Sequence, residues 1–334
     1  MVELIKVHGS QNQFFILDQE TLSQKLNDKE LKELALALTN HKTGLLHGSD
    51  GLLVVDKASS DALAQMRVIN ADGSEASMCG NGLRTVARYL HEKTGQTEFK
   101  VQTMKADLNV RKFEDFAHNV PAFAVEISPV SFNAASLPFK NLGRERLIND
   151  FVPEIYPGLK FTSLAVPNPH LISFMSQEQI ESNILGGVGS YLNGDNPYYP
   201  DGVNVNFAQI IDKNKIFVRT FERGVGFTNA CGTGMSATSL ALALTHPEAG
   251  ELEQTITVYN PGGFVKTIPH YDALHHRYWI ELIGNATFTD KINISEEDLK
   301  NHNFTHAAIT STNEQDAYLN FVNNLPHFNN VTSL

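Results

Sequence analysis

The sequence predicts an α+β fold in which one structural unit occurs twice. Segments with the alternation and β-branched composition of strands outnumber the helical segments, which are few and long. The only two cysteines of the 334-residue chain, Cys79 and Cys231, lie in the same short frame, Cys-Gly-x-Gly. They are separated by nearly half of the chain, so we expect two copies of one unit with a boundary near residues 125–130.

Strand patterns alternate with two helical patterns in the first half of the chain, each bounded by Gly, Asn, Asp or Pro. Its predicted strands are 2–8, 14–18, 51–56, 66–70, 99–103 and 122–128. Its predicted helices are 28–40 and 80–95. The predicted strands of the second half are 161–167, 171–175, 202–211, 215–221, 256–260 and 278–284. One helix is predicted there, over 232–245, and two short ones are predicted near the C-terminus, in "SEEDLKNHNF" and "NEQDAYLNFVNNL".

Each cysteine frame stands at the same place in this order of elements. A strand leads into a turn-rich link, the Cys-Gly-x-Gly frame follows, and a helical stretch comes next. The first copy reads "MRVIN", "ADGSEAS", "MCGNG" and "LRTVARYLHEK", and the second reads "KIFVRTF", "ERGVGFTN", "ACGTG" and "MSATSLALAL". This shared order supports the prediction of a duplicated unit.

Composition excludes several classes of partner. The net charge of −11 argues against nucleic acid or an anionic membrane surface. No apolar run approaches the length of about 20 residues that spans a bilayer, and the N-terminus lacks a signal pattern, so we expect a cytoplasmic protein. Metal binding is not expected either, because two cysteines and histidines without ligand spacing give too few soft ligands.

A cysteine directly before a helix is suited to proton transfer. The positive end of the helix dipole favours its thiolate, so we expect the pKa of each thiol to be lowered. The glycines of the frame expose backbone N–H groups to a carboxylate or an oxyanion. Two such frames that face one small carboxylate could remove the α-proton from one face and return a proton to the other.

Other roles for Cys79 and Cys231 remain open at this level. Either cysteine alone is more often a small buried apolar residue. A single cysteine with a histidine partner could serve nucleophilic acyl transfer, and the pair could serve redox chemistry. The repeated frame favours acid–base work by two thiols over these alternatives.

With these blocks in view, the sequence resembles the diaminopimelate epimerase family over about residues 3–290. The resemblance is carried by "KVHGSQNQFFILD", "DGLLVVD", "INADGSEASMCGNGLRTVARYL", "VQTMKADLNV", "VPNPHLISF", "DGVNVNF", "FERGVGFTNACGTGMSA" and "VYNPGGFVK". It implies a homodimeric enzyme without pyridoxal phosphate, metal or any other cofactor, which interconverts LL- and meso-diaminopimelate on the route to lysine and peptidoglycan precursors. It implies two similar domains, each a mixed sheet around a central helix, with the active site between them.

The domains expected from this resemblance are residues 1–128 with Cys79 and residues 129–285 with Cys231. The first would be completed by a returning segment near 286–300, and residues 291–334 would form a C-terminal extension of unassigned role.

The resemblance also implies the site residues. Cys79 and Cys231 match the acid–base pair of the family, and His170 and Glu222 match positions that influence thiol ionisation. The residues that match substrate-binding positions are Asn12, Asn70, Gly80, Asn81, Asn168, Asn204, Glu222, Arg223, Gly232 and Thr233. Taken one at a time, the asparagines also fit turns, and His170 also fits a structural role.

The chain departs from the family pattern at Gln13, Gly51 and Phe227, which leaves the substrate range open. Phe227 is expected to make the surroundings of the second cysteine more apolar. A racemase of another amino acid, such as histidine or a broad range, is the alternative activity. A catalytically silent binding protein is disfavoured because both cysteine frames are intact.

Overall fold

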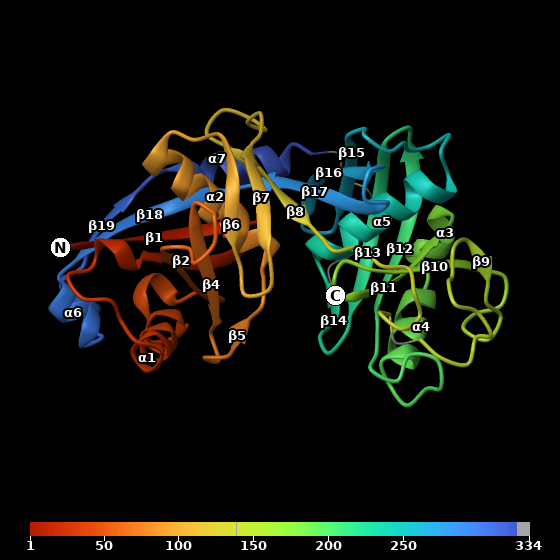
Figure 1. The fold of residues 1–334 in the computed structure, drawn as a ribbon, viewed down its shortest axis with the longest axis horizontal. Coiled ribbons are helices and arrows are strands. Elements are labelled where there is room, and N and C mark those ends of the chain that lie inside the picture. The colour runs from red at the N-terminus through yellow and green to blue at the C-terminus, as the bar shows by residue number, and fades with distance from the viewer. Residues whose placement is uncertain (138, 326–334) are drawn as a thin grey trace. The chain divides into compact units, whose positions relative to one another are not determined.

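The computed structural model describes residues 1–137 and 139–325, which form two compact units (Figure 1). Unit 1 consists of Met1–Val125 and Ile283–Leu325, and unit 2 consists of Glu126–Leu282. The chain leaves unit 1 within strand β8 (Ala122–Ile127) and returns to it within strand β17 (Arg277–Asn285). Unit 1 is therefore discontinuous in sequence, whereas unit 2 is one continuous segment.

Unit 1 is built on a mixed sheet with the order β19-β18-β1-β2-β3-β4-β6-β7-β8, in which β2–β3 and β4–β6 are parallel pairs. The short strand β5 pairs with β4. The bounds are β1 Val2–Gly9, β2 Asn12–Asp18, β3 Gly51–Asp56, β4 Ala64–Asn70, β5 Glu75–Ala76, β6 Glu98–Gln102, β7 Asp107–Lys112, β18 Thr287–Ile294 and β19 Ala308–Ser311. The first and last thirds of the chain thus meet in one sheet through β1 and β18.

One long helix lies on each face of this sheet. Helix α2 (Gly80–Thr94) contacts β1, β2, β3, β4 and β7, so the sheet wraps around it. Helix α1 (Asp28–Thr39) begins at a capping box formed by Asn27 and Glu30. Its buried residues, among them Leu31 and Leu34, pack with Phe15 and other strand residues on the opposite face. The remaining helical segments are η1 Gln19–Thr21, η2 Leu45–His47, α6 Glu296–Lys300, η3 Phe304–His306 and α7 Glu314–Asn323.

An ion pair anchors the C-terminal helix α7 to the central helix α2. Both carboxylate oxygens of Glu314 accept hydrogen bonds from Arg88, at 2.5 and 2.7 Å, and Glu314 also accepts from the Phe288 backbone N–H at 3.0 Å. The Arg88 guanidinium lies 4.0 Å from the centre of the Phe288 ring. The segment after β18 is therefore held against the core of unit 1.

Unit 2 has a sheet with the order β9-β10-β11-β12-β13-β15-β16, in which β11–β12 and β13–β15 are parallel pairs. The short strand β14 pairs with β13. The bounds are β9 Asp150–Phe151, β10 Lys160–Ala165, β11 Pro169–Phe174, β12 Asn204–Asp212, β13 Lys215–Glu222, β14 Gly226–Thr228, β15 Ile256–Asn260 and β16 Gly263–Asp272.

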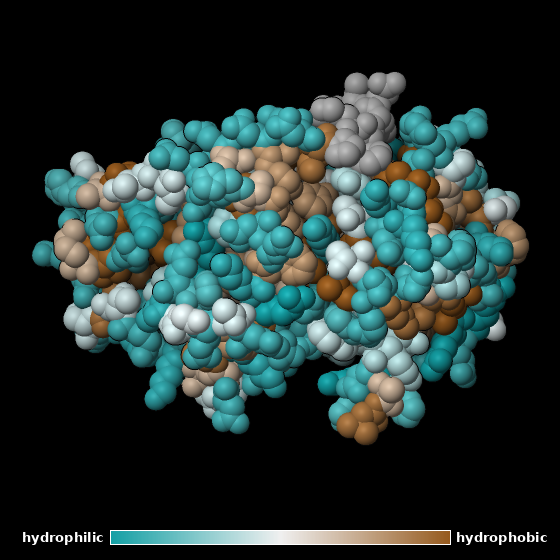
Figure 2. Space-filling view, turned by 90° about the horizontal axis from the view of Figure 1, so that it is seen from above, coloured by the Kyte–Doolittle hydropathy of each residue, from teal (hydrophilic) through white to brown (hydrophobic). Residues whose placement is uncertain are grey.

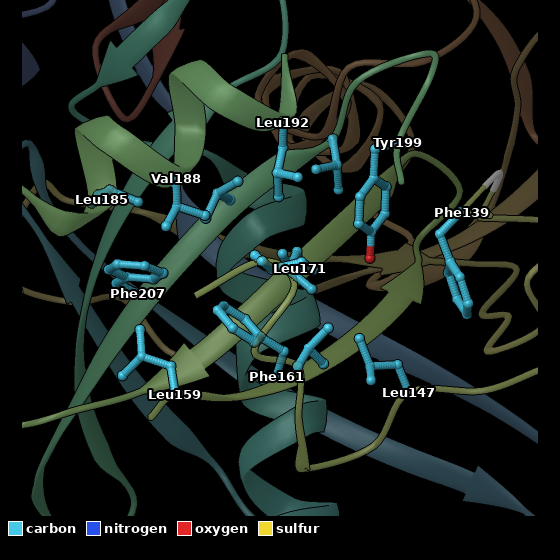
Figure 3. Close-up of a cluster of buried hydrophobic side chains, with 14 of the residues drawn as sticks. Phe139, Leu147, Leu159, Phe161, Leu171, Leu185, Val188, Leu192, Tyr199 and Phe207 are labelled. Atoms are coloured by element: carbon cyan, nitrogen blue, oxygen red, sulfur yellow. The ribbon is translucent and has the colours of Figure 1, made fainter. Parts of the chain in front are cut away.

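This second sheet also wraps around a helix. Helix α5 (Gly232–Thr245) contacts β10, β11, β12, β13, β15 and β16. Helices α3 (Gln177–Glu181) and α4 (Ile184–Leu192) lie outside the sheet. Leu185, Val188 and Leu192 of α4 point toward Leu171 and other apolar side chains of the sheet in a fully buried cluster (Figure 3).

Strand pairing demonstrates that the two units are copies of one arrangement. The series β1, β2, β3, β4, β5, α2, β6, β7 and the series β10, β11, β12, β13, β14, α5, β15, β16 have the same order of elements and the same parallel and antiparallel pairs. The predicted α+β fold with two similar sheet-and-helix units is confirmed.

Most of the predicted elements occur in the structure within a few residues of their expected bounds. These include the helices at 28–40, 80–95 and 232–245 and the two short C-terminal helices, which are α1, α2, α5, α6 and α7. The elements that the sequence analysis missed are β5, β7, β9, β14, β16, β18, β19, α3 and α4. Hydrophilic side chains cover most of the face shown in Figure 2. Among the described helices, none has the length and apolarity to cross a membrane.

The Arg88–Glu314 pair provides a test of how firmly α7 is attached. We expect Glu314→Gln to lower the free energy of unfolding by about 2 to 3 kcal/mol, because it leaves the buried Arg88 charge without its main partner. Urea unfolding measures the change. Glu33→Gln is the control, since Glu33 forms only an exposed pair with Lys29 at 3.8 Å and should cost less than about 0.5 kcal/mol. Equal losses in both variants would contradict the anchoring role.

Candidate active site

In unit 1, Cys79 is the N-cap residue of the central helix α2. Its backbone is extended, with φ −141° and ψ 112°, and its Sγ accepts a hydrogen bond from the Gly82 N–H at 3.4 Å. The first N–H groups of a helix have no intrahelical partners, so a side chain at this position caps the helix. The thiol is thereby fixed at the positive end of a helix that the sheet encloses.

Polar side chains connect Cys79 to strand β2. The Cys79 Sγ lies 3.7 Å from Asn12 Oδ1, which also accepts from Asn81 Nδ2 at 3.3 Å. The Asn12 amide donates to Asp50 Oδ2 at 2.6 Å. Arg84, one turn into α2, donates to Asn81 Oδ1 at 2.9 Å. The frame of Cys79 is thus bordered by an amide pair whose orientation is fixed from both sides.

In unit 2, Cys231 is the N-cap residue of α5 in the same backbone conformation. Its φ and ψ are −130° and 101°, and its Sγ accepts from the Gly234 N–H at 3.4 Å. A Cβ on Gly234 would lie 2.4 Å from Asn206 Oδ1, so a side chain at this position would displace the Asn206 amide. The Thr233 hydroxyl lies 3.6 Å from the sulfur.

A buried chain of hydrogen bonds leads to Thr233. Asn206 Nδ2 bonds to His170 Nδ1 at 3.0 Å, and His170 Nε2 bonds to Asn168 Oδ1 at 3.2 Å. Asn168 Nδ2 then donates to Thr233 Oγ1 at 3.2 Å. Because Thr233 accepts from Asn168, its own hydroxyl hydrogen is available to the Cys231 sulfur. In this network each residue donates a hydrogen bond to the next, from Asn206 through His170, Asn168 and Thr233 to Cys231.

Asn206 was not among the residues that the sequence analysis selected. It is fully buried, accepts from Thr220 Oγ1 at 2.9 Å and holds the histidine in one tautomer. The signal that could have found it lies in "NVNF", where two asparagines face the same side of an apolar strand. A buried polar residue in such a strand needs a specific partner.

Residues in equivalent positions of the two units make equivalent contacts. Phe14 pairs with Gly51 in unit 1, as His170 pairs with Asn204 in unit 2, so Asn12 and Asn168 correspond. Each of these asparagines contacts the residue two positions after the cysteine, which is Asn81 in unit 1 and Thr233 in unit 2. Asn70 and Glu222 also correspond, since each precedes its cysteine by nine residues.

The other predicted site residues lie at the ends of strands near these frames. In unit 2, Asn204 Oδ1 accepts from the Arg223 N–H at 2.8 Å, and Arg223 Nη1 donates to the Asp201 carbonyl at 3.1 Å. Glu222 accepts from Thr228 Oγ1 at 2.6 Å. In unit 1, Asn70 Nδ2 donates to Ser74 Oγ at 2.9 Å.

The structure also gives the contacts of the three residues that depart from the family pattern, which are Gln13, Gly51 and Phe227. The Gln13 backbone N–H donates to Asp50, and Gly51 pairs with Asn70 in the sheet. Phe227 packs edge-on against Phe221, with ring centres 5.4 Å apart, and is partly exposed.

The expectation of lowered thiol pKa values is wrong for both cysteines. Burial raises the pKa of Cys79, although hydrogen bonds from the frame and the charge of Arg84 oppose this. Burial together with the negative charge of Glu222 raises the pKa of Cys231 to about 12. Loss of water therefore outweighs the helix dipole at both positions, and the free thiols are protonated at neutral pH.

Each frame thus combines a protonated thiol with a helix N-terminus. The thiol can donate a proton, and it becomes a base when a positive charge stabilises its thiolate. The backbone N–H groups at the start of α2 and of α5 can donate hydrogen bonds to a carboxylate. The chemistry that these groups support is proton transfer at a carbon next to a carboxylate.

Comparisons with known proteins agree with this chemistry. Residues 4–128 and 165–288 match the sequence model of the diaminopimelate epimerase family. The chain is 53% identical over 322 residues to the diaminopimelate epimerase of Ligilactobacillus salivarius (strain UCC118), across 96% of this chain and 98% of that protein. It is 51% identical over 328 residues to the diaminopimelate epimerase of Lactiplantibacillus plantarum (strain ATCC BAA-793 / NCIMB 8826 / WCFS1), across 97% and 98%.

A solved structure shares the fold at much lower identity. The phenazine biosynthesis protein of the PhzF family from Bacillus anthracis superposes with a TM-score of 0.60, at 13% identity, over 88% of this chain and 99% of that chain. At this identity the likeness concerns the fold alone.

His170 makes the stability of the chain depend on pH. Burial, and then the charge of Arg223, lowers the pKa of folded His170 from 6.5 to about 3. Between these values the unfolded chain binds more protons, so stability falls as pH falls, by at most about 1.4 kcal/mol per pH unit from this residue. We expect His170→Gln to be less stable at pH 7 but to have a shallower pH dependence. Urea unfolding at pH 7, 6 and 5 measures both slopes, and equal slopes would contradict the assignment.

Proposed function

The chain belongs to the diaminopimelate epimerase family and is an isomerase, and we propose that it interconverts LL-2,6-diaminopimelate and meso-diaminopimelate with two cysteines as acid and base. The observation that carries this proposal is the repeated frame: each unit begins its enclosed helix at a cysteine, Cys79 or Cys231. A two-base racemisation uses one proton-transferring group on each face of the carbon, and two frames supply two such groups.

In the proposed reaction, one cysteine acts as a thiolate and the other as a thiol. The thiolate removes the α-proton, and the bonding pair of the C–H bond remains on the carbon as an enolate-like carbanion. The thiol on the opposite face then delivers its proton to that carbon, which inverts it. The enzyme ends with the proton on the first cysteine and the second as thiolate, ready for the reverse direction.

The backbone donors proposed for the reacting carboxylate are those of Gly80, Asn81, Gly232 and Thr233. The negative charge that develops on this carboxylate as the proton leaves would be stabilised by the N–H groups at the start of each helix. The raised thiol pKa values support this order of events. Substrate must bring its α-ammonium group, or the protein must offer another positive charge, before a thiolate becomes populated.

The far end of diaminopimelate carries a second ammonium and a second carboxylate. We propose that Arg223 binds this carboxylate with Asn12, Asn70, Asn168 and Asn204, and that Glu222 binds the ammonium. The contact of Asn204 with the backbone of Arg223 supports a common role for these two residues. His170 is proposed to act on Cys231 through Asn168 and Thr233.

The remaining parts of the proposal follow from family membership. Residues 1–128, with a returning segment near 286–300, and residues 129–285 would be the two epimerase-like domains. The enzyme would work as a cytoplasmic homodimer without pyridoxal phosphate or metal, and would supply precursors of lysine and peptidoglycan.

Incubation with LL-diaminopimelate in deuterated water tests the activity. We expect deuterium at the α-carbon and a mixture of LL- and meso-isomers, because the proton that is returned comes from solvent-exchanged thiol. Mass spectrometry and chiral chromatography follow both products. Alanine and histidine serve as controls, since they lack the second ammonium and carboxylate. Exchange of these amino acids at the rate of diaminopimelate would favour the alternative, a racemase of broad range.

The two-base mechanism predicts a specific pattern in Cys79→Ser and Cys231→Ser. A hydroxyl is far less acidic than a thiol and is a poor base at neutral pH, so each variant should lose nearly all epimerisation. Each variant should still eliminate halide from one stereoisomer of a β-halogenated analogue, because elimination needs a base on one face only. Parallel assays of epimerisation and elimination make the comparison. A variant that epimerises near the wild-type rate would exclude the two-thiol mechanism.

A further inference from the structure

Arg84 is a fully buried cation that has no carboxylate partner among the described residues. Its side chain has no exposed surface, and its hydrogen-bond acceptors are the Asn285 carbonyl at 3.2 Å, Ser10 Oγ at 3.2 Å and Asn81 Oδ1 at 2.9 Å. The remaining nitrogen, Nη1, is buried without a partner in the part of the chain that the structure describes. Buried charges are normally paired, so this arrangement calls for an explanation.

The next arginine of the same helix has carboxylate partners, as buried charges normally do. Arg88, one turn after Arg84, pairs with Glu314 and with Glu92. Two arginines of α2 are therefore buried in one unit, and only the one nearer to Cys79 lacks an opposite charge. Burial against the sheet is therefore common to both arginines, whereas the unpaired charge is specific to Arg84.

The backbone around Arg84 is shaped to hold the guanidinium group. A Cβ on Gly284 of β17 would lie 2.7 Å from Arg84 Cζ, and a Cβ on Gly9 of β1 would lie 2.7 Å from the Asn81 carbonyl oxygen and 2.9 Å from Arg84 Nη2. Only glycine at these two positions allows the strands to approach the planar group this closely. The guanidinium group therefore occupies a fixed slot at the start of α2.

One relay of hydrogen bonds leads from this slot to the thiol of Cys79. Arg84 donates to Asn81 Oδ1, Asn81 donates to Asn12 Oδ1, and Asn12 Oδ1 accepts from the Cys79 thiol at 3.7 Å. We propose that Arg84 is a positioning residue for Cys79: it aligns the Asn81–Asn12 amide pair that orients the protonated thiol, and its fixed positive charge makes the Cys79 thiolate accessible once the proton has left. The thiolate would be the missing opposite charge of Arg84.

The other charged and titratable groups near this pair do not supply that charge. Asp50 raises the pKa of Cys79, so it acts against the thiolate. Burial raises the pKa of Tyr318 on α7 to about 12, and burial lowers the pKa of His8 to about 4, so both groups are neutral at pH 7. Burial lowers the pKa of Arg84 itself to about 10. Of the charges that oppose this shift, the one on Cys79 has the largest effect.

Among the described residues of unit 2, the position equivalent to Arg84 carries no cation. Ser236 stands five residues after Cys231, as Arg84 does after Cys79, and its hydroxyl donates to the Gly232 carbonyl at 2.9 Å. The groups around Cys231 are the neutral His170 network and the negative Glu222, which raises the pKa of Cys231. The duplicated backbone therefore carries unequal electrostatics, and Arg84 favours the thiolate on Cys79 over the thiolate on Cys231.

This inference deepens the proposed two-thiol function, but its test does not depend on turnover. Alkylation by iodoacetamide proceeds through the thiolate, so its rate as a function of pH reports the pKa of each cysteine. Digestion and mass spectrometry resolve the Cys79 and Cys231 peptides in one sample. The variants are Arg84→Gln, Arg84→Lys as the charge-retaining variant, and Arg88→Gln as the control on the same helix.

We expect the alkylation midpoint of Cys79 to rise by about one pH unit or more in Arg84→Gln, because an opposite charge at close range is lost. The midpoint of Cys231 should stay within about 0.3 units, the limit we set for no change. Arg84→Lys should lie nearer to wild type, and Arg88→Gln should match wild type although it unfolds at lower urea. An unchanged Cys79 midpoint, or equal shifts at both cysteines, would overturn the proposal.

If Arg84→Gln fails to fold by circular dichroism, Gly284→Ala provides the same test. It retains the arginine but displaces the guanidinium group from its slot, so the Cys79 midpoint should rise, and an unchanged midpoint would overturn the proposal. Failure of the proposed function is distinguishable, since wild-type enzyme that does not exchange diaminopimelate in deuterated water would leave the alkylation result intact.

Discussion

The start of a helix enclosed by a sheet is the constraint on which the candidate site depends. The first N–H groups of α2 and α5 have no intrahelical partners, and each helix is enclosed by the strands that contact it. Cys79 and Cys231 each accept one of these hydrogen bonds, from Gly82 and from Gly234. The same arrangement that fixes the sulfur leaves the remaining donors facing outward along the helix axis. Structure and reactivity therefore come from one requirement, which is to satisfy the free N–H groups at the start of an enclosed helix.

The sequence was sufficient to predict the two frames, the helices that follow them and the paired-unit fold, because these rest on local patterns of glycine, cysteine and apolar period. It failed where tertiary contacts decide. Helix α4 contains three glycines and would be a poor helix alone, but its Leu185 and Leu192 are buried in the cluster of Figure 3. The apolar pattern of strand β18 is interrupted by Asp290 and Lys291. The strand forms because β1 and β19 pair with it.

Cys79 and Cys231 were predictable from their repeated frame, whereas the candidate residues outside the frames were predictable only through the resemblance to the family. Arg84 was not selected because an arginine in a helix is usually exposed to solvent. Its burial beside Gly284 is visible only in the structure. The thiol pKa values were predicted with the wrong sign, since sequence reveals the helix dipole but not the loss of water around the sulfur. The two units place equivalent residues at equivalent positions, but different side chains at those positions, such as Arg84 and Ser236, give the two cysteines different electrostatic surroundings.

The pairing of β1 with β18 has a consequence for the synthesis of the chain. The ribosome releases residues 2–9 first, but their partner strand, residues 287–294, emerges only when most of the chain has been made. Unit 2 is continuous and can complete its sheet earlier, so it should fold as an independent domain while unit 1 waits. Long-range strand pairing of this kind slows folding and leaves an apolar strand edge open in the interval. The nascent N-terminal half is therefore the part of the molecule most in need of chaperone protection.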